Sequence, residues 1–318
     1  MAWRGEADSG KRRRSSTKVL YVAIAANIAI ALFKYAAAAI TSSPAMLAEA
    51  FHSTADSCNE FLLLFGIRRS QRPPDELHPF GHGKELYFWS LIVAIVIFGL
   101  GAGFSLDDGI SRLLHPVATT KPNWNYAILA VAAIFEGYSW LISRQELRAR
   151  ARPGQSLWRV IRASKDPSVF TVFLEDSAAL IGITIAALGI ALGQVLDNPY
   201  CDPAASILIG VLLTGVAILL ANESRELLLG ERAHLTQIQR VKEIIRSEPA
   251  VEGVGDLYTM QLGPDQVLLA VALRFSSHLR VQELESTIDG LEKKIRQQEP
   301  AIVRIFIEAE SLKGKLAA

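Results

Sequence analysis

The sequence has few features of a disulfide-stabilised, nucleic-acid-binding or enzymatic protein. Its 318 residues include only two cysteines, Cys58 and Cys201, which lie far apart and indicate neither a disulfide framework nor a CxxC metal knuckle. The 33 basic and 32 acidic residues leave a formal net charge of +1, whereas nucleic-acid binders usually carry a basic excess. No nucleophile–base pair, glycine-rich phosphate loop or HExxH string is present, so we predict that the protein is not an enzyme and carries no bound cofactor.

Apolar residues are abundant and make up 50% of the chain. A helix needs about 20 mostly apolar residues to cross a bilayer. Segments of this kind occupy residues 18–40, 44–68, 85–114, 124–149, 167–194 and 204–228. None of them alternates as a membrane β-strand would, so we predict six transmembrane helices within a domain of residues 18–228.

Residues 1–17 are predicted to form an N-terminal tail. The basic run Lys11–Arg14 is followed by a long apolar stretch, which favours a retained first helix over a cleaved signal peptide. Glu6 and Asp8 are unusual in a mitochondrial transit peptide, so we expect a bacterial cytoplasmic membrane.

Charged residues in the loops predict the orientation of the chain. One side carries nearly all the loop lysines and arginines, namely Lys11, Arg12, Arg13, Arg14, Arg68, Arg69, Arg72, Lys84, Arg144, Arg148, Arg150, Arg152, Arg159, Arg162 and Lys165. The other side carries little beyond Lys121. By the positive-inside rule, both termini are expected in the cytoplasm.

The composition changes near residue 229, and residues 229–318 are predicted to form a cytoplasmic α+β domain. Two segments, Thr236–Glu248 and Val281–Gln298, have helical periodicity. Three segments favour strands: Val251–Leu262, Gln266–Phe275 and Ile302–Glu308. The expected order is α-β-β-α-β, a ferredoxin-like arrangement.

Ionisable side chains in the predicted membrane helices indicate functional or structural roles, because each raises the free energy of membrane insertion by roughly 2.5–3.5 kcal/mol. His52 and Asp56 lie four residues apart on one helical face and can reach one small cation together. Glu60 follows on the same helix, and Glu175 and Asp176 lie in the fifth span. Electrostatic or structural roles explain other charges as well: Glu60 in a water-filled vestibule, Glu49 at a wet helix end, and Lys34 snorkelling or paired with a carboxylate within the bundle.

A second candidate metal site lies in the loop between the second and third spans. His78 and His82, with Asp75 nearby, have a spacing compatible with a transition metal. A loop that begins a helix, with Gly81 and Gly83 allowing close packing, explains the same residues equally well.

These motifs together resemble the cation diffusion facilitator family. The resemblance rests on His52-x3-Asp56, on the string HPFGHGK at residues 78–84, and on six spans followed by an α-β-β-α-β tail. The string LEDSAAL at residues 174–180 resembles the branch that contains mitochondrial-type zinc transporters and their bacterial relatives. The resemblance implies a dimeric metal/proton antiporter.

The resemblance also implies roles for particular residues. His52, Asp56 and Asp176 match the family's transport site, whereas Val172 stands where a further His or Asp is expected. Glu175, Glu60 or water would then complete the shell. The loop residues Asp75, His78 and His82 match the family's loop metal site.

The tail departs from the family pattern. Phe306 and Glu308 occupy the positions of a usual ligand pair, although His278 matches a ligand of some members. We therefore expect the tail to form a homodimer by packing, without a binuclear metal cluster.

The expected activity is export of a divalent cation in exchange for protons. An imidazole with carboxylates suits a borderline metal, so zinc is the first candidate, followed by cobalt, iron(II) and manganese. The expected partners are the metal ion, protons, the lipid bilayer and a second copy of the chain, with no nucleic acid. A non-transporting membrane metal sensor or scaffold is the alternative, favoured by the ligand missing at Val172.

Overall fold

A computed structural model describes residues 27–115, 122–151 and 154–309. The chain divides into two compact units, which are described separately. The first contains the described residues up to Gly66, together with Trp89–Ile161 and Ser168–Asn222, and the second contains Ile67–Phe88, Arg162–Pro167 and the chain from Glu223 onward. The predicted tail of residues 1–17 and the start of the first predicted span lie outside the described residues.

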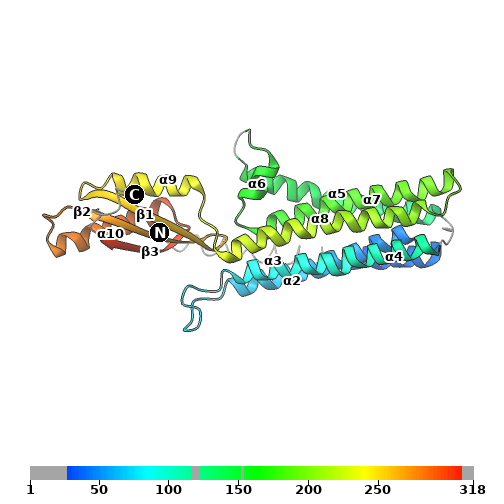
Figure 1. Ribbon diagram of the computed structural model, residues 1–318, viewed down its shortest axis with the longest axis horizontal. Coiled ribbons are helices and arrows are strands. Elements are labelled where there is room, and N and C mark those ends of the chain that lie inside the picture. The colour runs from blue at the N-terminus through cyan, green and yellow to red at the C-terminus, as the bar shows by residue number, and fades with distance from the viewer. Residues whose placement is uncertain (1–26, 116–121, 152–153, 310–318) are drawn as a thin grey trace, which may run out of the picture. The chain divides into compact units, whose positions relative to one another are not determined.

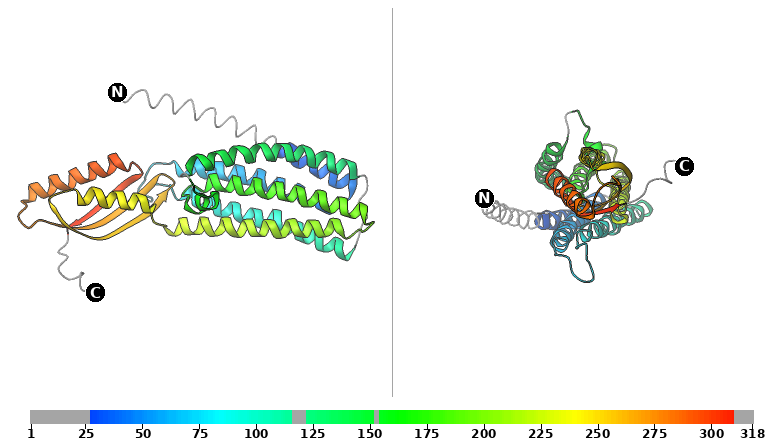
Figure 2. Two further views of the ribbon diagram at one scale, coloured as in Figure 1. Left: turned by 90° about the horizontal axis from the view of Figure 1, so that it is seen from above. Right: turned by 90° about the vertical axis from the view of Figure 1, so that its left-hand side faces the viewer.

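The first unit is a bundle of long helices that lie side by side (Figures 1 and 2). A helix at Asn27–Thr41 is followed by α2 (Pro44–Ser70), α3 (Glu85–Val96), the π-helix η1 (Ile97–Gly103), α4 (Phe104–Leu114), α5 (Pro122–Arg150), α6 (Leu157–Ala163), α7 (Pro167–Val195) and α8 (Cys201–Leu229). The short helix α6 was not predicted. The other boundaries agree with the predicted apolar segments to within a few residues wherever the structure describes them.

Four of the described helices are long and apolar enough to cross a membrane: Glu85–Leu114, Asn123–Ala149, Phe170–Val195 and Cys201–Leu229. Between 22% and 39% of each apolar window is buried, so most of these side chains face outward, as they would toward lipid. The chain is therefore a multi-pass membrane protein. The helix Asn27–Thr41 is shorter, and α2 carries many polar residues, so the count of six spans stays a prediction.

The hairpin before α2 forms at Ser42-Ser43-Pro44. Ser42 has a positive φ of 56°, and Pro44 begins the helix, where its missing N–H costs nothing. The Ser43 hydroxyl accepts a hydrogen bond from the Met46 N–H at 3.2 Å, which caps the first turn. Asp202 of α8 accepts another from the Ala45 N–H, so the start of α2 is tied to a second helix.

The third predicted span is interrupted by η1, which contains Gly99, Gly101 and Gly103. A Cβ at Gly101 would lie 3.1 Å from the Leu213 side chain, so the close approach to α8 requires a small residue there. The hydroxyl of Ser105 donates to the Gly101 carbonyl at 2.6 Å and satisfies a group that the wider turn would leave less well paired.

The second unit contains the predicted α-β-β-α-β order: α9 (Leu235–Arg246), β1 (Val251–Gly263), β2 (Gln266–Phe275), α10 (Val281–Gln298) and β3 (Ile302–Ala309). The sheet order is β1-β2-β3, antiparallel between β1 and β2 and parallel between β2 and β3. Both helices pack on one face, where Ile245 and Leu291 meet alternate residues of β2. The other face exposes Tyr258 and Phe306.

Lys34 and Glu49 form a fully buried ion pair between the helix Asn27–Thr41 and α2, which confirms pairing within the bundle. The Lys34 ammonium donates to Glu49 Oε2 at 3.1 Å and to the Ser53 hydroxyl at 2.7 Å. Both side chains are 0% exposed. Each charge therefore depends on the other to remain inside the bundle.

We predict that Lys34→Met lowers the thermal unfolding temperature in detergent, because it leaves Glu49 buried without a counter-charge, a loss of about 3–5 kcal/mol. The double variant Lys34→Met/Glu49→Gln should recover most of that loss. Arg225→Met is the matched control, because its ion pair with Glu226 is exposed and contributes roughly 0–1 kcal/mol. Unfolding temperatures that do not differ between the single and double variants would contradict this.

Candidate metal sites

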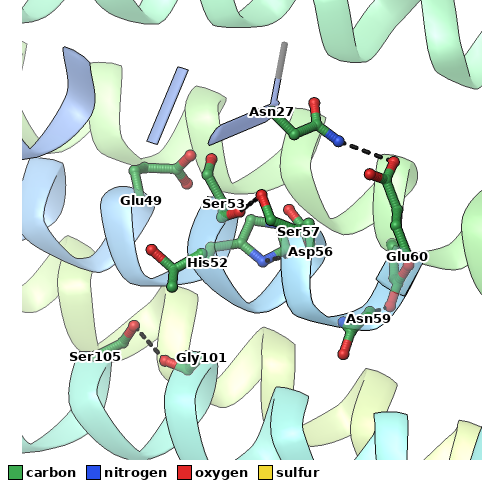
Figure 3. Close-up of polar contacts among 12 residues, drawn as sticks. Asn27, Glu49, His52, Ser53, Asp56, Ser57, Asn59, Glu60, Gly101 and Ser105 are labelled. Carbon is green, nitrogen blue, oxygen red and sulfur yellow. Dashed lines mark hydrogen bonds and ion pairs between the residues drawn. The ribbon is translucent and has the colours of Figure 1, made fainter. Parts of the chain in front are cut away.

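The first candidate site lies on α2, in the interior of the bundle. His52 and Asp56 are both buried, and His52 Nδ1 lies 3.5 Å from Asp56 Oδ1 (Figure 3). Neither ring nitrogen of His52, nor Asp56 Oδ1, has a hydrogen-bond partner among the described residues. The structure thus brings the predicted pair together and leaves its metal-binding atoms unoccupied by protein donors.

Asp176 is placed differently from the expectation that it faces His52 and Asp56. Its Oδ2 accepts hydrogen bonds from Ser139 at 2.9 Å and Ser143 at 3.1 Å, both on α5. The structure therefore directs this carboxylate toward α5, and it does not join the α2 pair in a set of three close ligand atoms.

Glu175 faces α2 instead. Its Oε1 accepts a hydrogen bond from Asn59 Nδ2 at 2.7 Å, and both residues are buried. The two neighbouring acids on α7 point to different helices because consecutive residues differ by about 100° around a helix. The sequence placed these two carboxylates on different faces but did not reveal which face meets α2.

Glu60 lies one turn beyond Asp56 on α2. Its Oε1 accepts a hydrogen bond from Asn27 Nδ2 at 2.9 Å, and its Oε2 has no partner among the described residues (Figure 3). Glu60 is half-buried, so both a ligand role and the predicted place in a wet vestibule are compatible with its position.

The loop residues Asp75, His78 and His82 form the one group of three His, Cys, Asp or Glu residues, within the described parts of the chain, whose ligand atoms all lie within 4.8 Å of one another. Asp75 Oδ1 lies 3.2 Å from His78 Nδ1, and Asp75 Oδ2 lies 3.0 Å from His82 Nε2. The backbone N–H of His78 donates to Asp75 and lowers the pKa of that carboxyl.

The two glycines of this loop have the packing role that was the alternative explanation. Gly81 has a φ of +87°, which favours glycine, and a Cβ at Gly83 would clash with the carbonyl oxygen of Leu262. Close packing and a group of three candidate metal ligands therefore coexist in one loop.

Sequence reasoning missed Asn59, Ser139 and Ser143, which hold the two acids of α7. Asn59 could have been found by its spacing, because it lies seven residues after His52 and three after Asp56 on the same helical face. The serines on α5 have no comparable signal, because their partner comes from another helix.

Two family models match the chain. The cation efflux transmembrane domain matches residues 20–229, and the cytoplasmic domain of cation efflux proteins matches residues 234–312. The chain belongs to the cation efflux family. This confirms the resemblance to cation diffusion facilitators.

Curated members of the cation efflux family include close relatives. The proton-coupled zinc antiporter SLC30A9, mitochondrial, of Homo sapiens is 35% identical over 283 residues, which cover 87% of this chain and 50% of that protein. The metal tolerance protein C4 of Arabidopsis thaliana is 29% identical over 93% of this chain and 74% of its own length. The magnetosome protein MamM of Paramagnetospirillum magneticum is 26% identical over 79% of this chain and 74% of its own length. The chain spans about half the length of the SLC30A9 antiporters that it matches.

We predict that the loop binds Zn²⁺ and that His82→Ala weakens this binding at least about tenfold, since it removes one of three ligands. Titration calorimetry in a His52→Ala background isolates the loop. The affinity should fall as the pH is lowered, because imidazole binds metal as the neutral ring. The lowered pKa of Asp75 favours the anionic form of that ligand.

His115→Ala is the control, because His115 lies at the end of α4 and outside the loop. If His82→Ala bound zinc as tightly as the parent, the loop would not be a metal site, and close packing at its glycines would explain these residues.

Proposed function

We propose that this cation efflux protein exports a divalent transition-metal cation, zinc first, from the cytoplasm in exchange for protons. The observation that carries the proposal is the buried His52–Asp56 pair on α2, whose ligand atoms have no protein donors among the described residues. Two costly groups on one buried face need a compensating cation. The human relative, a proton-coupled zinc antiporter, supports the same cargo and coupling.

The cargo ion is bound in our proposal by His52, Asp56 and Asp176. Asp176 joins the α2 pair by exchanging its two serine donors for the metal, which requires a rotation of α7 or of the side chain. Glu175 and Glu60 are the candidates for the position left open at Val172. Imidazole and carboxylate ligands suit zinc, and cobalt, iron(II) and manganese are the alternative cargoes.

Proton exchange follows from the chemistry of these ligands. Histidine binds metal as the neutral ring and carboxylates bind it as anions, so metal loading releases protons. After the metal leaves, protonation neutralises the acids, which is far less costly than carrying bare carboxylates through lipid. The same residues thus carry the cation in one direction and protons in the other.

We place six spans in the membrane, with a tail of residues 1–17, a transmembrane domain of residues 18–228 and a cytoplasmic domain of residues 229–318. The basic loops support cytoplasmic termini by the positive-inside rule. We assign the bilayer to a bacterial cytoplasmic membrane, although the human relative is a mitochondrial protein.

A homodimer through the cytoplasmic domain completes the proposal. One face of its sheet is covered by α9 and α10, whereas the other exposes Tyr258 and Phe306. A packed interface rather than a metal cluster fits the presence of Phe306 and Glu308 at the family's ligand positions.

A non-transporting metal sensor or scaffold is the second candidate, because Val172 replaces a ligand of the transport site. The buried charges of His52, Asp56 and Asp176 speak against it, because a site without transport has no reason to keep them.

We predict that liposomes containing the protein take up Zn²⁺ against an imposed pH gradient, and that His52→Ala and Asp176→Ala each reduce the rate at least about tenfold, as loss of a ligand does. A fluorescent zinc indicator inside the vesicles measures the rate, and cobalt, iron(II) and manganese are tested in parallel.

His115→Ala and Asp289→Ala are the matched controls, since both residues are exposed and lie outside the site. Parent-like flux in the His52 and Asp176 variants would refute the site, and metal binding without flux in the parent would favour the sensor.

A further inference from the structure

Asn59 is a fully buried residue of α2 with one half of its amide unused. It is 0% exposed, and its Nδ2 donates to Glu175 Oε1 at 2.7 Å. Its Oδ1 has no hydrogen-bond partner among the described residues. A buried amide oxygen without a donor is costly and rare, so it calls for an explanation.

The orientation of this amide is fixed by Glu175. Rotating the amide by half a turn would place Oδ1 against a carboxylate oxygen, two acceptors with no proton between them. The hydrogen bond to Glu175 therefore keeps Nδ2 toward α7 and leaves Oδ1 as the free acceptor.

Asn59 continues the face of α2 that carries the metal-binding pair. His52, Asp56 and Asn59 have the spacing i, i+4 and i+7, which places them along one stripe of the helix (Figure 3). Each contributes a buried acceptor atom without a protein donor in the described chain: the unprotonated ring nitrogen of neutral His52, Asp56 Oδ1 and Asn59 Oδ1. A row of acceptors with no donors is satisfied by a cation.

Neighbouring polar groups do not offer the same explanation. Ser53 accepts from Lys34 and is thereby satisfied, and the Glu49 carboxylate, whose Oε1 has no hydrogen-bond partner among the described residues, already has Lys34 as its cation through Oε2. Asn125, the other fully buried asparagine of the described bundle, uses its Oδ1 to accept from the Thr41 hydroxyl at 2.8 Å. Asn59 differs from Asn125 because its amide oxygen has no hydrogen-bond partner among the described residues.

We propose that Asn59 Oδ1 is a ligand of the cargo cation beside His52 and Asp56, and that Glu175 is a positioning residue that orients the amide. The proposal rests on the proposed function and deepens it. Asn59 supplies the ligand that the sequence lacks at Val172, and Glu175 acts through Asn59 instead of binding the ion.

A neutral amide oxygen gives this site a particular character. It adds a ligand without adding a negative charge, so it needs no proton when the cation leaves. It also raises the proportion of oxygen among the metal ligands, which broadens the metal selectivity of the site to include cobalt, iron(II) and manganese. Asn59 is in this way a determinant of both selectivity and proton count.

The test measures metal binding to the purified full chain in detergent, in a His82→Ala background that removes the loop site. Zn²⁺ competes with Co²⁺, whose visible absorption reports the number and type of ligands. Asn59→Leu is expected to weaken Zn²⁺ binding at least tenfold and to change the Co²⁺ spectrum. The matched control Asn125→Leu, the same change at a buried asparagine whose oxygen is already bonded, should leave the spectrum as in the parent.

Two variants of Glu175 separate positioning from ligation. Glu175→Gln retains an oxygen acceptor for Asn59 and should keep the parent spectrum and affinity, whereas Glu175→Leu removes the acceptor and should change both. Asn59→Gln retains both an amide donor for Glu175 and a ligand oxygen and should bind Zn²⁺ more tightly than Asn59→Leu, which covers the case in which the Leu variant fails to fold.

An Asn59→Leu protein with parent-like affinity and spectrum would overturn the proposal, as would loss of binding in Glu175→Gln. His52→Ala tells the two proposals apart. If His52→Ala abolishes binding and flux while Asn59→Leu changes neither, the transport function stands and the role of Asn59 fails. If Asn59→Leu weakens metal binding but the parent protein shows no metal flux, the ligand role of Asn59 stands and the proposed transport function is refuted.

Discussion

The bundle depends on one constraint, which is that every ionisable group inside the apolar layer must be compensated by another helix or by a bound cation. A single helix, α2, carries Glu49, His52, Asp56 and Glu60 on its buried side. The preceding helix supplies Lys34 to Glu49 and Asn27 to Glu60, whereas the ring nitrogens of His52 and Asp56 Oδ1 have no protein hydrogen-bond partner among the described residues and are left to the cargo cation in our proposal. Because insertion of each charge costs roughly 2.5–3.5 kcal/mol, these contacts specify which helices must surround α2.

The two candidate metal sites differ in how much of the fold they require. Asp75, His78 and His82 lie within eight consecutive residues, and a glycine with positive φ turns the loop so that their ligand atoms meet. The α2 site draws on residues more than 100 positions apart, such as Asn59 and Glu175. A local site can assemble with its loop, whereas the membrane site exists only after α2 and α7 have packed together.

The same difference explains what could be predicted from the sequence. Apolar runs and alternation are local properties, so the helices α5, α7 and α8 and the α-β-β-α-β order were predicted with boundaries close to those observed. The seven-residue helix α6 is too short to leave a periodic signal, and η1 continues the apolar run of the third span, so hydropathy does not distinguish it from the α-helix on either side. The pair His52–Asp56 was predicted from spacing on one helix. The hydrogen bonds of Asp176 to α5 and of Glu175 to α2 depend on the rotation of α7, which no local pattern encodes.

The π-helix η1 separates the third long helix into two halves that are out of phase. Each i→i+5 bond spans one residue more than an α-helical bond, and one residue corresponds to about 100° of rotation. A helical wheel drawn through Glu85–Leu114 as one regular helix would therefore assign wrong faces to everything after Ile97. A gain or loss of one residue within η1 would therefore rotate Phe104–Leu114 against its neighbours, while the length of the helix would change by only about 1.5 Å.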